Sequence, residues 1–231
     1  MTDMKTLYTI FGSFLATVFA LQAGAQVTTP PRKLTEATIT YDIVINSGKS
    51  NTQPSAVDLL DGATSVIYLK GNSSRSEMIS SLGTQATIID GKTGEVTFLK
   101  DYGEQKYMIK LTPDNWKQSN TKYEGISFTY VEEYKVIAGY KCQKAIGRLT
   151  DSTTFNVYFT RDLVPVNKDF QYLNRNLPGL AMQYEANLGK SGRVVTYTVS
   201  SINFNPVLQA RFDLPKSGYR VMTYEESRGL N

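Results

Sequence analysis

Residues 139–167, GYKCQKAIGRLTDSTTFNVYFTRDLVPVN, and residues 176–185, NLPGLAMQYE, decide the fold that we expect for this chain. A polar turn at 150–153 follows Ile146, and Phe155, Val157 and Phe159 alternate after it. This period of two is typical of a half-buried antiparallel hairpin. A structural turn is predicted before the next strand, at Leu177, Pro178, Gly179 and Leu180.

That turn also carries a backbone prediction. Pro178 fixes its own φ near −65°, and Gly179 can adopt a positive φ. The pair suits the central positions of a type II turn that spans 177–180.

Strand patterns continue outward from the hairpin at short, regular spacing. Apolar and polar residues alternate over 38–45, and hairpin breakers separate the patterns that follow. The further predicted strands cover 65–70, 75–80, 85–90, 95–100, 106–111, 126–130 and 194–204. With so few helical patterns, we predict a mainly β fold whose antiparallel sheet curls on itself.

Short helical segments are expected at only three places. Thr112 can cap a turn that begins at Pro113, so a helix is predicted near 115–120. The other candidates lie at 57–60 and 207–211, and the second of these is compatible with a helical turn or a loop. The only tryptophan, Trp116, is expected to fill the core.

The N-terminus has the pattern of a secretory signal peptide. Lys5 precedes an apolar run, and the small residues 23–25 are typical of a cleavage site before Gln26. A membrane anchor is the alternative, but the run is shorter than the ~20 apolar residues that span a bilayer. We therefore divide the chain into a signal peptide (1–25), a polar leader (26–35), a single β domain (36–226) and a C-terminal tail (227–231). The protein is expected to be exported to the periplasm, to associate with the outer membrane or to be extracellular.

Composition limits the chemistry. The 231 residues contain no histidine, which removes the commonest general base and metal ligand, and a single cysteine, Cys142, which we expect to be a buried strand residue. The acidic pairs 132–133 and 225–226 would point to opposite faces if they lie in strands. A net charge of +4 from interspersed residues gives no nucleic-acid surface. No enzyme activity, cofactor or metal site is predicted, and the chain is not expected to span a membrane.

Several motifs resemble a known family. They are the strand GYKCQKA (139–145), the strand end YFT (158–160), NLPGL (176–180) and the closing FDLP (212–215). Together they resemble the secreted GLPGLI-type proteins of Bacteroidetes and related proteins of unknown function, although Asn176 and Ala181 replace the first Gly and last Ile of that signature. Those proteins are similar to the lipoprotein carriers of the LolA/LolB type. The resemblance implies an unclosed, strongly curved half-barrel with helices over an apolar concave face.

The resemblance also implies a function. Inward apolar residues of such a half-barrel would line a groove for a lipid, an acyl chain or a lipidated protein, or they would simply pack as a core. The predicted groove residues are Ile43, Leu69, Phe98, Ile109, Phe128, Tyr130, Val157, Met182 and Tyr184. The first hypothesis is a periplasmic carrier or chaperone, the second a cell-envelope structural or assembly protein that binds a protein partner, and the third a carboxylate-dependent hydrolase.

The hairpin tip carries one further motif. Asp151-Ser152-Thr153 resembles the O-glycosylation acceptor of exported Bacteroidetes proteins, which would place a glycan on Ser152. Alternatively, Asp151 and Ser152 only cap the turn through side-chain hydrogen bonds.

Overall fold

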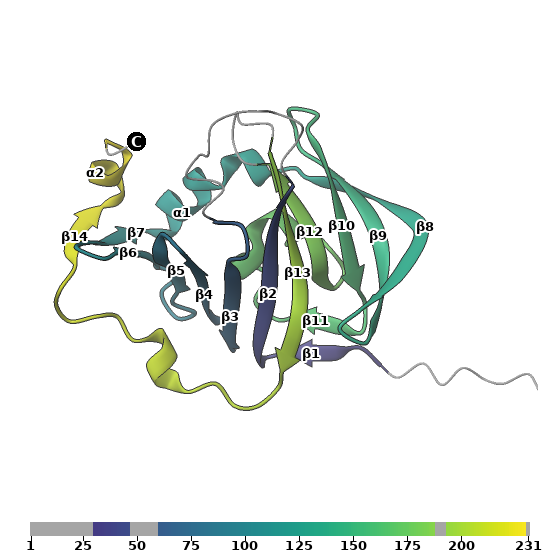
Figure 1. The fold of residues 1–231 in the computed structure, drawn as a ribbon, viewed down its shortest axis with the longest axis horizontal. Coiled ribbons are helices and arrows are strands. Elements are labelled where there is room, and N and C mark those ends of the chain that lie inside the picture. Colours follow the sequence, from purple (N-terminus) through teal and green to yellow (C-terminus); the bar gives the residue numbers. More distant parts are fainter. Residues whose placement is uncertain (1–29, 47–59, 188–192, 230–231) are drawn as a thin grey trace, which may run out of the picture.

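The computed structural model describes residues 30–46, 60–187 and 193–229, so the predicted signal peptide and most of the helical candidate at 57–60 lie outside the described residues. Twelve strands form one sheet in the order β14-β7-β6-β5-β4-β3-β2-β13-β12-β10-β9-β8 (Figure 1). Neighbours in this sheet are antiparallel except for β14 and β7. The two edges, β14 and β8, do not pair with each other, so the sheet remains an open half-barrel, as predicted.

Short turns join the successive strands from β3 to β7. The first seven are β1 (Arg32–Leu34), β2 (Glu36–Asn46), β3 (Thr64–Lys70), β4 (Ser73–Ser80), β5 (Gly83–Ile89), β6 (Val96–Tyr102) and β7 (Gln105–Leu111). The others are β8 (Ser127–Ile137), β9 (Tyr140–Arg148), β10 (Thr154–Thr160), β11 (Leu163–Pro165), β12 (Leu180–Asn187), β13 (Val194–Asn203) and β14 (Arg220–Thr223).

The helical segments are short, as expected. They are α1 (Pro113–Ser119), the 3-10 turns η2 (Thr121–Tyr123), η3 (Asp169–Asn174) and η5 (Gln209–Phe212), and α2 (Tyr224–Arg228). Thr112 caps α1 as predicted, because its hydroxyl accepts a hydrogen bond from the Asn115 backbone at 3.2 Å. No helix in the described ranges is long and apolar enough to cross a membrane.

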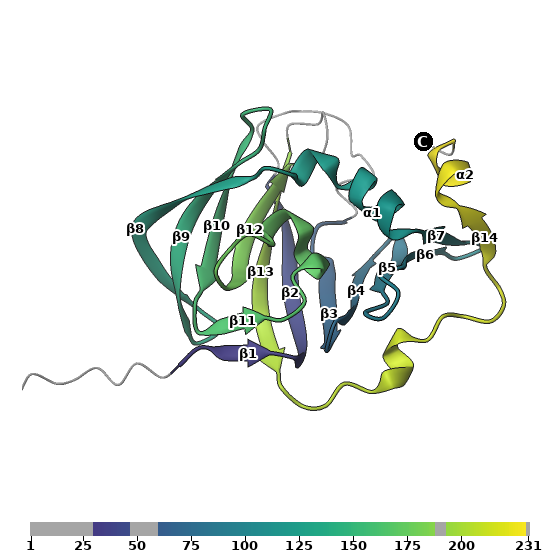
Figure 2. The ribbon, with the colours of Figure 1, turned by 180° about the vertical axis from the view of Figure 1, so that it is seen from behind.

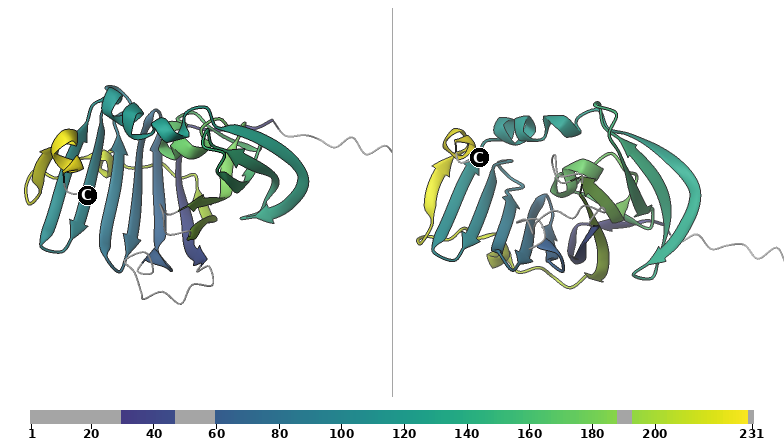
Figure 3. Two further views of the ribbon diagram at one scale, coloured as in Figure 1. Left: turned by 90° about the horizontal axis from the view of Figure 1, so that it is seen from above. Right: turned by 45° about the horizontal axis from the view of Figure 1, so that its top comes forward.

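The concave face of the curled sheet is partly covered. Figures 2 and 3 show α1 along its upper rim, with η3 and the small parallel sheet of β1 and β11 inside the curl. Leu34 of β1 and Leu163 of β11 are fully buried there against Tyr41 of β2. The long connection from β13 crosses the opposite, convex face, where Val207 and Arg211 accept hydrogen bonds through their backbone carbonyls from Lys70 and Arg75. It thereby brings β14 to the far edge of the sheet.

The prediction of a type II turn at 177–180 is wrong. The four residues do form the bend that leads into β12, but Gly179 does not have a positive φ. Glycine is needed there for space, because a Cβ would lie 1.9 Å from the backbone oxygen of Thr160. The loop after β10 and the start of β12 are therefore in backbone contact.

One further sequence prediction needs correction, and one is confirmed. The acidic pair 225–226 lies in α2 and not in a strand: Glu226 completes the cap at Thr223, and Glu225 accepts a hydrogen bond from Asn115. Cys142 is buried as predicted, but Ile146, which shares its parity along β9, is exposed. The pairing of β8 with β9 slips between Tyr130 and Tyr134, so regular alternation does not continue along this edge.

Candidate functional site: a trough on the concave face

Several inward side chains of β3, β4 and β5 are small or polar. The register aligns Ile67, Ser76, Thr87 and Phe98 in one row across neighbouring strands. The next row contains Ser65, Met78, Gln85 and Lys100. Serine and threonine are too short to fill the space beneath the covering helices, so this part of the concave face remains hollow.

The concave face contains a central hollow of about 340 Å³. Its floor is the small-residue region of β3 to β5, and its walls come from α1, η2, η3, β12 and β13. Six aromatic side chains contribute to the walls, namely Trp116, Tyr123, Phe170, Tyr172, Tyr184 and Tyr197. This volume is at the lower end of small-molecule sites, and the combination of aromatic walls with a few polar groups is typical of them.

A second, outer hollow of about 420 Å³ lies further along the same face, between the sheet and α2. Phe98 and Ile109 contribute to its apolar lining, and Tyr224 approaches from α2. Gln85 and Thr87 line both hollows. The two hollows therefore adjoin on β5, and we call the pair the trough.

The trough is roofed by aromatic contacts. The Trp116 ring meets the rings of Phe98 and Tyr172 edge-on, each with centroids 5.9 Å apart. Tyr172 also donates a hydrogen bond to Glu124, which pairs with Arg175 at 2.9 Å. Tyr172 lies within η3 and Arg175 directly follows it, so this cluster fixes η3 above the sheet.

Tyr184 and Tyr197 line the inner wall of the central hollow, and the buried Tyr41 packs against Tyr184. Tyr184 stacks on Tyr197 with centroids 4.7 Å apart and meets Tyr41 edge-on at 5.9 Å. The Tyr41 hydroxyl donates to the backbone oxygen of Ala181 at 2.8 Å and accepts from Gln171 of η3 at 2.6 Å. Burial raises the pKa of all three hydroxyls above the usual value for tyrosine. These groups are therefore neutral hydrogen-bonding and packing groups at physiological pH.

The nine predicted groove residues do not lie together. Tyr184 lines the central hollow, whereas Phe98 and Ile109 line the outer one. Ile43, Leu69, Val157 and Met182 are fully buried in three separate core clusters. Phe128 and Tyr130 lie on β8 and contact Phe155 and Phe159. The polar floor of the trough was not predicted, because only apolar alternation marks an inward strand face in the sequence.

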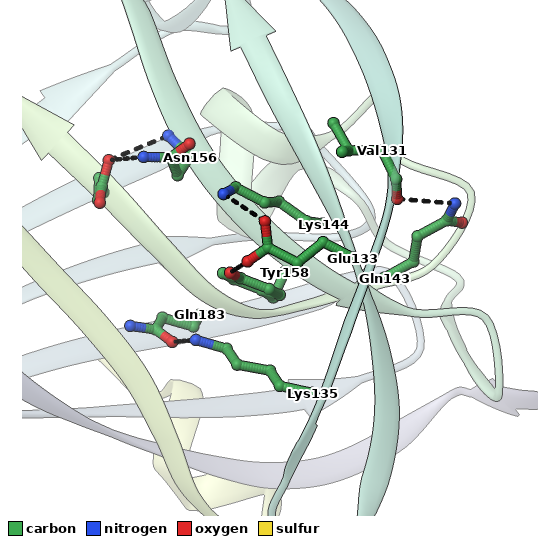
Figure 4. Close-up of polar contacts among 9 residues, drawn as sticks. Val131, Glu133, Lys135, Gln143, Lys144, Asn156, Tyr158 and Gln183 are labelled. Atoms are coloured by element: carbon green, nitrogen blue, oxygen red, sulfur yellow. Dashed lines mark hydrogen bonds and ion pairs between the residues drawn. The ribbon is translucent and has the colours of Figure 1, made fainter.

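The convex face of β8 to β12 carries a polar network (Figure 4). Lys144 and Tyr158 pair in register opposite to the inward Ala145 and Val157, so they point outward. Glu133 accepts hydrogen bonds from both, at 2.7 Å from Lys144, and Lys135 donates to Gln183. The network joins β8, β9, β10 and β12.

Hydrogen bonds lower the pKa of five carboxyl groups. Hydrogen bonds from Lys144 and then Tyr158 hold the pKa of Glu133 below its usual value. Hydrogen bonds likewise lower the pKa values of four other carboxyl groups, those of Glu36, Asp101, Glu124 and Asp151. A general acid at neutral pH requires a shift in the opposite direction.

Cys142 is buried in the sheet, and Ser152 lies at the tip of the hairpin between β9 and β10. Burial raises the pKa of the Cys142 thiol to about 11, so this thiol is protonated and inert at neutral pH. Ser152 is exposed at the hairpin tip with a φ of 68°. Asp151 caps the turn as predicted, accepting from the Thr153 backbone at 2.8 Å. A glycan on Ser152 stays a prediction.

Comparison with known proteins gives similarity in fold alone. No family model matches the sequence and no curated protein matches it, so membership of the GLPGLI-type group stays a prediction. An uncharacterized conserved protein from Thermus thermophilus has a similar structure, with a TM-score of 0.50 at 12% identity over 82% of this chain and 91% of that one. This similarity agrees with the open half-barrel described above.

Two other solved structures are more distant in shape. PNGF-II has a TM-score of 0.46 at 18% identity, and the match covers 85% of this chain and 33% of that chain. This chain thus spans about a third of the length of PNGF-II. MucB in complex with MucA(peri) has a TM-score of 0.41 at 13% identity, over 82% of this chain and 56% of that chain.

Proposed function

We propose that the protein is a non-catalytic, exported binding protein that carries an amphiphile with an acyl chain in the trough. One observation carries the proposal: the two hollows adjoin at Gln85 and Thr87 on the concave face. An acyl chain needs length more than width, and the trough combines apolar surface from Ile67, Phe98 and Ile109 with aromatic walls. The resemblance to lipoprotein carriers supports the same ligand class and a location in the periplasm.

Five carboxyl groups whose pKa is lowered by hydrogen bonds favour a binding role over hydrolysis. Hydrogen bonds favour the ionised form of each of these five groups. Cys142 is protonated and buried. The trough therefore offers shape and surface contacts, which suit transport or storage of a ligand.

Trp116 makes a direct test simple. It is the only tryptophan in the chain and it lines the central hollow, so fluorescence excited selectively at tryptophan reports on this site. We expect brominated stearate to quench Trp116 at saturable, stoichiometric concentrations, because bromine quenches indole on contact. Native mass spectrometry of protein from its own host should show a co-purifying lipid. Full fluorescence in the presence of the brominated chain, together with a ligand-free native mass, would argue against the proposal.

A second function is favoured by the edge strand β8. Among the described strands β8 is paired on one side only, by β9, and it exposes Tyr130, Tyr134 and Val136. Such an edge can accept a strand from a protein partner, as an envelope assembly protein would. Cross-linking in the native host, with a photoreactive residue at Val136 and another at exposed Lys92 as control, would test it. A specific adduct at Val136 alone supports a partner at this edge, and equal labelling at both positions counts against it.

A further inference from the structure

The outer hollow differs from the central one in charge. Lys100 of β6 and Arg228 of α2 line the outer hollow, together with Gln85 and the hydroxyl-bearing Ser227. No carboxylate belongs to this lining. The central hollow, in contrast, includes Glu77 and Asp169. The trough thus has one basic end, close to α2.

These two cations have no ionic partner within the described part of the chain. Among residues 30–46, 60–187 and 193–229, no side-chain carboxylate lies within 4.0 Å of Lys100 or Arg228. The acidic side chains nearest to them in sequence are bound elsewhere. Asp101 pairs with Lys106 at 2.8 Å, Glu225 accepts from Asn115 at 3.3 Å, and Glu226 accepts from the Thr223 backbone at 2.8 Å.

Two unpaired cations beside an apolar floor suit the anionic head group of an amphiphile. A guanidinium and an ammonium both form short, charge-assisted hydrogen bonds with carboxylate or phosphate oxygens. Phe98 and Ile109 line the same hollow and offer apolar contact to the first part of a chain. The rest of the chain can then pass Thr87 toward the aromatic walls of the central hollow.

We propose that the outer hollow binds the anionic head group of the carried amphiphile, through Lys100 and Arg228, and so fixes the direction in which the chain lies in the trough. This inference rests on the proposed carrier function and adds to it a ligand class, the single-chain anionic lipids. It also assigns a binding role to α2, whose residues Tyr224, Ser227 and Arg228 close the outer hollow.

The test compares two ligands that differ only in head group. Quenching of Trp116 is titrated with dibromostearate and with dibromostearyl alcohol, using the wild type and the variants Lys100→Gln and Arg228→Gln. We expect stearate to bind roughly tenfold more tightly than the alcohol, since one charge-assisted interaction is of that order. Each variant should lose most of this preference. Lys110→Gln is the matched control, because Lys110 is exposed on neighbouring β7 at a position of opposite parity to Ile109.

The outcomes separate the two proposals. If both ligands quench equally in the wild type, the carrier function stands and the head-group site is rejected. If neither quenches, the carrier function itself fails. Inorganic phosphate in excess should not displace stearate, because it lacks the chain, and displacement would show a free-anion site in place of a lipid head-group site. Thermal unfolding of each variant checks that the fold is retained, and a Lys110→Gln protein with the same loss of preference would also overturn the assignment.

Discussion

The two halves of the sheet differ in how their inward side chains fill the concave face. In the half formed by β9, β10 and β12, the inward side chains are large and small residues that interlock. The Phe155 ring occupies the space that a side chain at position 147 would need, because a Cβ on Gly147 would lie 2.2 Å from it. In the half formed by β3, β4 and β5, Ser65, Ser76 and Thr87 leave their space open. A core and a binding site are thus made from the same strand geometry by the choice of inward residues.

Removal of an aromatic ring should give the largest difference in the free energy of unfolding between the two halves. Phe159 is fully buried on β10, and we expect Phe159→Ala to lower the free energy of unfolding by about 3–5 kcal/mol. Phe98→Ala is the matched variant in the other half, and it should cost less because Phe98 is half-buried and borders the outer hollow. Denaturant unfolding measures both. Equal losses would mean that the trough half is packed as tightly as the other.

A backbone contact gives the next prediction. Gly179→Ala places a methyl group against the Thr160 carbonyl oxygen, so we expect a loss of about 1–3 kcal/mol in the free energy of unfolding. Gly229→Ala is the control, since the nearest atom to its Cβ would be the Glu226 oxygen at 3.5 Å and its φ is −79°. The reason is a close approach and not a strained φ. Full stability of Gly179→Ala would refute the contact.

Tyr41 of β2 links β12 to η3, and its removal tests that link. Tyr41→Phe leaves the Ala181 carbonyl and the Gln171 amide without this partner, which should cost about 1–2 kcal/mol. Burial raises the pKa of Tyr41 in the folded protein. Above a pH of about 10 the unfolded hydroxyl ionises first, so the free energy of unfolding falls as the pH rises. The variant should show a shallower alkaline decline than the wild type, and an identical slope would contradict the buried position.

The sequence predicted the packed half better than the trough. Alternation in the hairpin at 139–160 identified Phe155, Val157 and Phe159 as inward residues, because apolar side chains on alternate positions need burial whatever their neighbours are. Ser76 and Thr87 are ordinary residues on a solvated strand face, so nothing local showed that they face inward. Their role depends on strand register and on the cover by α1 and η3, which are properties of the tertiary fold. Likewise, the need for Gly179 depends on Thr160, nineteen residues earlier in the chain.

A substitution at Thr87 should change stability least and should distinguish the trough half from the packed half most directly. Thr87 lines both hollows, so Thr87→Leu should extend into open space and change the free energy of unfolding by less than about 1 kcal/mol. The added side chain would nevertheless block the junction of the hollows, and quenching of Trp116 by brominated stearate should weaken by roughly tenfold or more. Met182→Trp is the matched variant in the packed half, where Met182 is fully buried, and it should cost about 1–3 kcal/mol. Calorimetry and the fluorescence titration give the two readouts. If Thr87→Leu destabilises the protein as much as Met182→Trp does, the trough is a filled core and cannot hold an acyl chain.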